Sequence, residues 1–227
     1  MSLLQFLNSP ENSVARERMV HMKAALQMKL AAASGGYQLQ MTEPEIDNAG
    51  FDFTAAHRYD LLHLQNKSTL DSVGVNSWDF HPLLFQVPFL ERDISPKIDG
   101  VPIGGLDGAM GGALLHVISS EAAREDRLEV TYFYSDIFFL SAVEQGIYDQ
   151  KDFSVEEARD LLRKIRYGEW GKRIKLPKRA FLQIKSPAAI VAFRFHIPSP
   201  SNWVSLGHSC PEGLATLWSG EVNKWLP

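Results

Sequence analysis

The sequence predicts a mixed α/β domain in which a long helix precedes a group of closely spaced strands. Three observations lead to this expectation. A long helical pattern ends at the glycine pair 35–36, three short strand patterns follow it, and a second capped helix begins near residue 154. A helix followed by neighbouring strands is typical of an α/β or α+β sheet domain. The length of 227 residues suits one large domain, so we treat 1–227 as a single unit.

The first predicted helix spans residues 9–36. Ser9 or Asn12 is expected to cap its start, Pro10 suits a first turn, and the glycine pair ends it. Its apolar residues form two stripes at helical spacing, so we expect this helix to lie between two layers. The stronger stripe contains Ala15, Met19, Met22, Leu26 and Leu30, and the weaker one contains Val20, Ala24, Met28 and Ala31.

The remaining elements are predicted from local hydrophobic patterns and from turn and capping residues. A hairpin turn at 57–59 is expected to join two of the first three strands. Ser154 and Glu157 form a capping box for the second helix, which Gly168 ends. The proline- and glycine-rich stretch 81–115 predicts loops with short strands. The other expected elements are strands at 37–43, 51–56 and 60–67, a buried apolar stretch at 127–146, a helix at 154–168, a central strand at 188–198 and a terminal helix at 211–226.

Composition excludes several classes of protein. A hydrophobic content of 45% and a charged content of 22% are ordinary for a globular domain, and the net charge is −4. No apolar run approaches the roughly 20 residues of a membrane-spanning helix. The first residues lack a basic segment before an apolar one, so we expect no secretion signal. Cys210 is the single cysteine, which excludes an internal disulfide and a cysteine zinc cage and favours the cytoplasm.

A polar pocket is predicted where the second and third strands pair. Side chains two residues apart on a strand share a face, so Gln65 and Lys67 lie together with His63 behind them. On the preceding strand Asp52 shares a face with Thr54, and Phe51 and Phe53 take the opposite face. Pairing of these strands would bring Asp52, Gln65 and Lys67 to one pocket. Gly50 stands where the chain turns into the strand, and glycine makes such a turn without steric cost.

These side chains suit metal-assisted hydrolysis of a phosphodiester. Asp52 offers a hard anionic oxygen to Mg²⁺ or Mn²⁺, and Gln65 offers a neutral carbonyl oxygen. A divalent cation polarises the phosphate and lowers the pKa of a bound water. Lys67 can orient that water or offset the charge that develops on the phosphate.

The motifs "GFD" at 50–52 and "LQNKS" at 64–68 resemble those of the PD-(D/E)XK nuclease superfamily. The glutamine form is similar to that of Mrr-like restriction enzymes. The pattern Glu45, Asp47, Gly50, Asp52 looks like a variant found in small nuclease-like domains of prokaryotes and phages. The resemblance covers residues 11–68 and implies a restriction-endonuclease-like core: a helix, a mixed sheet whose first three strands start antiparallel, a helix and a further strand. A long C-terminal elaboration would follow.

The same resemblance implies the activity and the supporting groups. It implies an enzyme that cuts DNA, with RNA as a possible substrate, using Mg²⁺ or Mn²⁺, and a homodimer that cuts both strands. Members often carry a metal-supporting glutamate on the first helix. Glu17, in "RER", is favoured for this role over Glu11. Asp47 and Glu45 would be additional ligands or would support the ligands.

A basic segment from residue 159 to 185 is the predicted contact for the nucleic-acid backbone. It holds ten basic residues, and within it only Asp160 and Glu169 oppose them, which leaves a local excess of eight positive charges. The residues expected to contact phosphates are Arg163, Arg166, Lys172, Arg173 and Lys175.

Three other interpretations stay open. Because Gln65 replaces a carboxylate, the chain could be an inactive nuclease-fold module that binds nucleic acid or a protein partner in a defence or mobile-element system. It could also be an unrelated α+β domain whose acids solvate a loop. Finally, "LQIKS" at 182–186 repeats the motif spelling with Gln183 and Lys185, although no acid cluster on a strand precedes it. A chance repeat on a surface strand is the better interpretation of this second copy.

Overall fold

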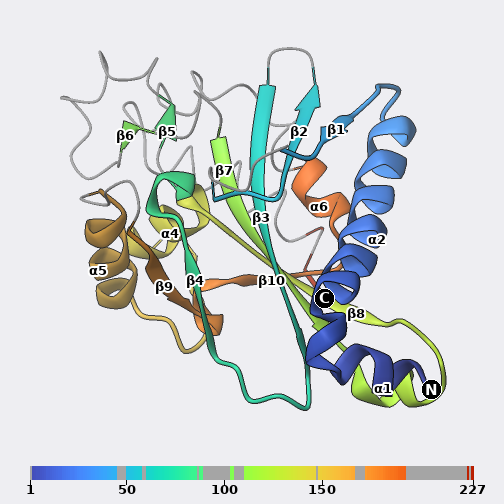
Figure 1. Ribbon diagram of the computed structural model, residues 1–227. Coiled ribbons are helices and arrows are strands. Elements are labelled where there is room, and N and C mark those ends of the chain that lie inside the picture. Colours follow the sequence, from blue (N-terminus) through green and yellow to red (C-terminus); the bar gives the residue numbers. More distant parts are fainter. Residues whose placement is uncertain are drawn as a thin grey trace.

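The computed structural model describes residues 2–44, 50–57, 60–85, 87–88, 103–104, 110–146, 148–166, 172–192, 224 and 226–227. This part of the chain forms a mixed α/β structure around one large sheet, as the sequence predicts (Figure 1). The strand order in that sheet is β1-β2-β3-β7-β8-β10. Its strands are β1 (Gln40–Thr42), β2 (Phe53–His57), β3 (Asp60–Leu70), β7 (Met110–Ile118), β8 (Val130–Asp136) and β10 (Leu182–Ile184).

The hairpin predicted around residue 58 is confirmed. β2 pairs antiparallel with β3, and the register ends with His57 opposite Asp60. β1 continues the antiparallel arrangement on the outer side of β2. The sheet becomes mixed at the next pair, because β7 runs parallel to β3. The antiparallel start followed by a parallel strand fits the predicted sheet.

The strand β7 lies in the centre of the sheet, so the prediction of loops with short strands over 81–115 is wrong for its last residues. The strand pairs with β3 on one side and with β8 on the other. Pattern analysis missed this strand because its glycines, Gly111 and Gly112, were interpreted as loop residues. Both glycines are required by close packing, because a Cβ on Gly111 would strike the Leu84 backbone and one on Gly112 would lie 2.7 Å from the Tyr134 ring.

The helix α2 (Ser13–Ser34) covers one face of the sheet, with its end at Gly35 and Gly36 as predicted. Its buried residues are Val20, Ala24, Met28 and Ala32. The stronger stripe is exposed instead: the exposed fractions are 66% for Met22, 59% for Leu26 and 57% for Leu30. The expectation of a helix packed on two sides is therefore wrong for the described residues, since only the weaker stripe packs on the sheet. Two short helices precede it, α1 (Leu3–Asn8) and η1 (Pro10–Asn12).

Short elements and two further helices cover the opposite face, as Figure 1 shows for α5 and the β4–β9 pair. The capping box of α5 is confirmed, since the Ser154 N–H donates to Glu157 Oε2 (2.9 Å) and the Glu157 N–H donates to Ser154 Oγ (3.2 Å). Within the apolar stretch 127–146, which forms β8 and α4, residues 132–143 are mostly buried, as predicted, whereas the first five residues are not. The elements on this side are β4 (Ser77–Phe80), η2 (Pro82–Phe85), α4 (Ile137–Glu144), α5 (Val155–Arg166), β9 (Ile174–Pro177) and η5 (Lys178–Ala180).

The predicted central strand at 188–198 is wrong where it can be compared. Residues Ala188–Val191 form the helix α6, which packs beside α2. A run of small and apolar residues does not distinguish a buried strand from a buried helix. The rest of that prediction, most of the terminal helix 211–226 and the ending at Gly168 lie outside the described residues.

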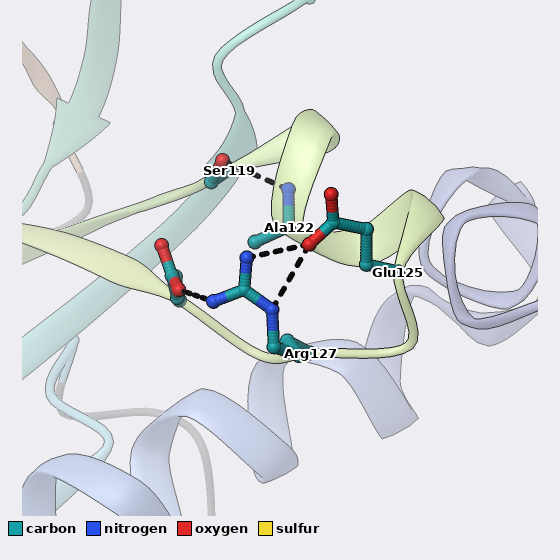
Figure 2. Close-up of polar contacts among 5 residues, drawn as sticks. Ser119, Ala122, Glu125 and Arg127 are labelled. Carbon is teal, nitrogen blue, oxygen red and sulfur yellow. Dashed lines mark hydrogen bonds and ion pairs between the residues drawn. The ribbon is translucent and has the colours of Figure 1, made fainter.

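The helix α3 (Ser120–Arg124) connects β7 to β8 and is held by local polar contacts (Figure 2). Ser119 Oγ accepts a hydrogen bond from the Ala122 N–H at 3.3 Å, which caps the helix. After the helix, Arg127 donates from Nε and Nη2 to Glu125 at 3.2 and 2.6 Å and also pairs with Glu129. These exposed charges fix the turn into β8. A parallel two-stranded pair, β5 (Val87–Pro88) and β6 (Ile103–Gly104), completes the described elements.

Candidate active site

The turn that leads into β2 requires a glycine, as predicted. Gly50 has a φ of +74°, which lies in the left-handed region. A Cβ at this position would stand 2.7 Å from the Cβ of His81 and 3.0 Å from Nη1 of Arg173. The turn is thus packed directly against these two side chains, and it delivers the chain to Asp52.

The carboxylate of Asp52 is bound to β3 between the two other predicted site residues. The Asp52 N–H donates to the Leu64 carbonyl at 2.8 Å, which extends the β2–β3 ladder by one bond. Its Oδ2 accepts a hydrogen bond from the backbone N–H of Asn66. Asn66 is the residue between Gln65 and Lys67. The fold therefore brings the carboxylate alongside the Gln-x-Lys segment.

One detail of the predicted pocket is wrong. Phe53 is buried on the α2 face, where it stacks on His21 with ring centroids 4.4 Å apart. Phe51 does not share that face. It stacks on His63 at 3.8 Å with the rings 8° from parallel, and His63 pairs with Thr54 through a 2.8 Å hydrogen bond. Strand alternation fails for Phe51 because β2 begins only at Phe53.

Gln65 is the buried polar side chain of the site. Its exposed fraction is 7%, and its Oε1 has no hydrogen-bond partner among the described residues. An unpaired buried acceptor typically costs about 1–3 kcal/mol, and a bound cation would satisfy this oxygen. Lys67 is half-buried and forms no ion pair with any residue in the described ranges.

The oxygens of Asp52 and Gln65 fit a hard divalent cation. Mg²⁺ prefers oxygen ligands and often takes only one or two from the protein, with water and substrate phosphate completing its shell. Among the residues that the structure describes, no group of three or more histidine, cysteine, aspartate or glutamate side chains is arranged to hold a metal. Asp47 and Glu45, which the sequence offers as additional ligands, lie outside the described residues.

The structure does not connect the helix glutamate to this site. Glu17 has the helical phase of the buried stripe that contains Val20 and Ala24, but it is exposed near the start of α2. Within the described part of the chain it forms no hydrogen bond or ion pair, while its neighbour Arg18 pairs with Glu43 at 3.7 Å. Glu11, the alternative, is exposed in η1.

The basic segment is less positive in the fold than in the sequence, because acids from outside the segment pair with it. Arg159 pairs with Glu144 at 3.1 Å and Arg179 with Glu157 at 2.6 Å. Counting opposing charges along the segment missed both glutamates, since neither lies between residues 159 and 185.

The five predicted phosphate contacts occupy different environments. Arg163 pairs with Asp160 at 3.2 Å on α5, and the side chain of Arg166 lies outside the description. Lys172 and Lys175 are exposed. Arg173 differs from these because its guanidinium lies against Gly50, two residues before Asp52. The fold thus brings one predicted phosphate contact to the turn that carries the predicted metal ligand.

The second motif copy and the described cavities lie elsewhere. Gln183 is exposed on β10, an edge strand of the main sheet, which agrees with its interpretation as a surface strand. A cavity of about 660 Å³ lies beside that strand and is lined by Phe133, Lys178 and Gln183. Others of about 880 and 550 Å³ lie at the start of α5 and beside α2. None of the three is lined by Asp52, Gln65 or Lys67.

Asn66 and His116 are contact residues that sequence analysis missed. Asn66 holds Asp52 through its backbone, and a backbone contact has no side-chain signature. His116 accompanies it from β7, with its Nε2 3.1 Å from Asn66 Oδ1. The glycine-rich sequence before His116 concealed the strand that carries it. The signal that could have found it was the apolar run "ALLHVI" after the glycines.

No protein-family model matches this chain, and no curated protein is detectably similar to it. In the described part of the chain, no helix is both long enough and apolar enough to cross a membrane.

Proposed function

We propose that this protein is a metal-dependent nuclease that hydrolyses DNA phosphodiester bonds, with Mg²⁺ or Mn²⁺ as cofactor. The observation that carries the proposal is the bond from the Asn66 N–H to the Asp52 carboxylate, because it joins the acid to the Gln-x-Lys segment. The buried Oε1 of Gln65, which has no partner among the described residues, supports it, since a cation would satisfy that oxygen. The resemblance to PD-(D/E)XK nucleases, with their restriction-endonuclease-like core, supplies the reaction class.

Each side chain has a stated role in this proposal. Asp52 and Gln65 would hold the metal, which polarises the scissile phosphate and lowers the pKa of its bound water. Lys67 places a positive charge where negative charge develops on the phosphate or orients the attacking water. Asp47 would support the metal, as the resemblance implies. The resemblance gives Glu17 the same role, but α2 covers the face of the sheet opposite Gln65 and Lys67, so we assign Glu17 no contact with the metal. A cytoplasmic setting, in a prokaryote or phage, accords with the single cysteine and the family resemblance.

Nicking of supercoiled plasmid in Mn²⁺ tests the proposal. The wild type should nick the DNA, and Asp52→Ala and Lys67→Ala should each reduce the rate by roughly 10²–10³-fold. Gln183→Ala is the matched control, because it alters the exposed second motif copy and should leave nicking unchanged. Equal rates for wild type and Asp52→Ala, or a loss confined to Gln183→Ala, would refute this assignment.

One observation favours a second candidate, a module that binds nucleic acid or a protein partner without cutting. The site has a neutral glutamine where a carboxylate would strengthen metal binding, and that glutamine is only 7% exposed. Binding of duplex DNA by wild type without nicking in either Mg²⁺ or Mn²⁺ would select this alternative. Gln65→Glu then becomes informative, because a restored carboxylate should raise metal affinity.

We further infer, from the family resemblance, that the chain forms a homodimer, and we place the contact between copies on the exposed apolar stripe of α2. Met22, Leu26 and Leu30 project an apolar strip from this helix. Light scattering over a range of protein concentrations should show a dimer, and Leu26→Glu should be monomeric. A wild type that stays monomeric at every concentration would exclude this interface.

A further inference from the structure

Asn66 connects the two faces of the sheet at the candidate site. Gln65 and Lys67 project from the face that also carries His63, and the alternation of β3 directs Asn66 to the opposite face, toward α2. Its backbone N–H donates to the Asp52 carboxylate, and its side-chain Oδ1 lies 3.1 Å from His116 Nε2. One residue is thus bonded on one side to the candidate metal ligand and on the other to a buried histidine.

His116 is suited to act as a fixed donor. Its exposed fraction is 0%, and its ring packs edge-on to Tyr132 with centroids 5.6 Å apart. Burial lowers its pKa from 6.5 to about 3, so the ring is neutral at physiological pH. With Asn66 Oδ1 facing the ring as the acceptor, the single ring proton of the neutral imidazole is on Nε2.

We infer that His116 and Asn66 are positioning residues that hold the Asp52 carboxylate in place for metal binding. This inference rests on the proposed function. Loss of the histidine donor would leave the amide oxygen of the part-buried Asn66 without its partner, so the side chain and the β3 backbone would have to readjust. The backbone N–H of that same residue binds Asp52. Groups that orient metal ligands typically change metal affinity or activity by about 10–100-fold when they are removed.

A pair of substitutions at His116 tests the inference. His116→Leu keeps an apolar side chain in the buried site and removes the donor. His116→Gln is its matched partner, because the amide Nε2 of glutamine can donate close to the position of the imidazole Nε2. Both leave Asp52, Gln65 and Lys67 unchanged. Thermal unfolding of each variant establishes that it is folded under the assay conditions.

The first readout is the NMR signal of the Asn66 backbone amide, which can be identified by its shift in Asp52→Asn. His116→Leu should move this signal and speed its hydrogen exchange, and His116→Gln should restore both. The second readout is Mn²⁺ affinity by calorimetry, which should weaken about 10-fold or more in His116→Leu and recover in His116→Gln. An unchanged Asn66 signal in His116→Leu, or a glutamine variant as defective as the leucine variant, would overturn the inference.

The two proposals fail in different ways. If the wild type neither binds Mn²⁺ nor nicks DNA, the proposed function is wrong, while the amide signal still decides whether His116 holds Asn66 and Asp52 together. If the wild type nicks DNA and His116→Leu retains wild-type Mn²⁺ affinity and nicking rate, the nuclease stands and the positioning role is refuted.

Discussion

At the scale of single residues, the candidate site depends on a few positions whose backbone conformation or charge state is narrowly set. Gly50 combines a left-handed backbone with direct packing on His81 and Arg173. His116 is a buried histidine whose neutral form bonds to Asn66. Each gives a prediction that can be measured without any assay of activity.

Gly50→Ala should destabilise the protein more than Gly36→Ala does. Both glycines have positive φ, of +74° and +80°, so both variants carry the strain of a left-handed alanine, about 1–2 kcal/mol. A Cβ on Gly36 meets nothing within 4 Å, whereas one on Gly50 would clash with His81. Urea unfolding should therefore give a larger loss of stability for Gly50→Ala. Equal losses would show that the turn relaxes away from His81.

His116 should make the wild type lose stability in acid faster than His116→Gln does. The pKa of His116 is about 3 in the folded state and near 6.5 when the chain is unfolded, so between these values only the unfolded state binds this proton. The free energy of unfolding then falls as pH drops, by at most about 1.4 kcal/mol per pH unit from this group. His116→Gln lacks the proton, so its unfolding free energy should fall less steeply between pH 6 and pH 4. Parallel curves from urea titrations at each pH would contradict the assignment.

At the scale of elements, α2 shows that the stripe of a helix with the largest apolar side chains is not always the stripe that packs on the sheet. The larger side chains Met22, Leu26 and Leu30 are exposed. The stripe that packs on the sheet consists of Met28 and three smaller residues, Val20, Ala24 and Ala32. Small residues allow the helix to approach the sheet closely. The sheet surface already carries bulky groups such as Phe53 and Leu64, so a second layer of large side chains would not fit against it.

Met28→Ala should cost about 2–5 kcal/mol in unfolding free energy, because it removes a fully buried side chain and leaves a cavity. Met22→Ala is the matched control in the same helix. Its side chain is 66% exposed, so the cost should stay within about 0.5 kcal/mol. Chemical denaturation at a concentration where the protein is monomeric compares the two. A larger loss for Met22→Ala would mean that the stronger stripe, and not the weaker one, faces the core.

At the scale of the whole molecule, the fold redistributes charge relative to the sequence. Arg159, Arg163 and Arg179 are paired with carboxylates, whereas Arg173 is held beside the Asp52 turn. If the chain binds DNA at the candidate site, Arg173 is the residue of the basic segment in position to contact a phosphate there.

Arg173→Ala should therefore reduce the salt dependence of DNA binding. Each phosphate contact contributes about 0.9 to the slope of log affinity against log salt, so this slope should become shallower by about one. Arg163→Ala, whose arginine is already paired with Asp160, should leave the slope nearly unchanged. Fluorescence anisotropy of a labelled duplex in Ca²⁺, over a series of KCl concentrations, measures both. Identical slopes for the two variants would remove Arg173 from the interface.

The sequence by itself determined the features that depend on a few neighbouring residues. The antiparallel hairpin of β2 and β3, the capping box at Ser154 and the glycine turn at Gly50 all follow from local backbone preferences. Alternation along β3 correctly placed Gln65 and Lys67 on the face of the sheet opposite Leu62 and Leu64, because successive side chains of a regular strand point to opposite faces. The association of Asp52 with the Gln-x-Lys segment follows from the same hairpin.

Only the tertiary structure decided which surfaces meet. It selected the weaker stripe of α2, placed the glycine-containing β7 at the centre of the sheet, made a helix of Ala188–Val191, and brought His116 to Asn66. It also paired Arg159 with Glu144, which lies outside the basic segment. These outcomes depend on the shape and charge of segments that are distant in sequence, and local spacing contains no information about the partner. The physical reason is that packing free energy depends on both surfaces in contact, whereas propensity and periodicity describe only one.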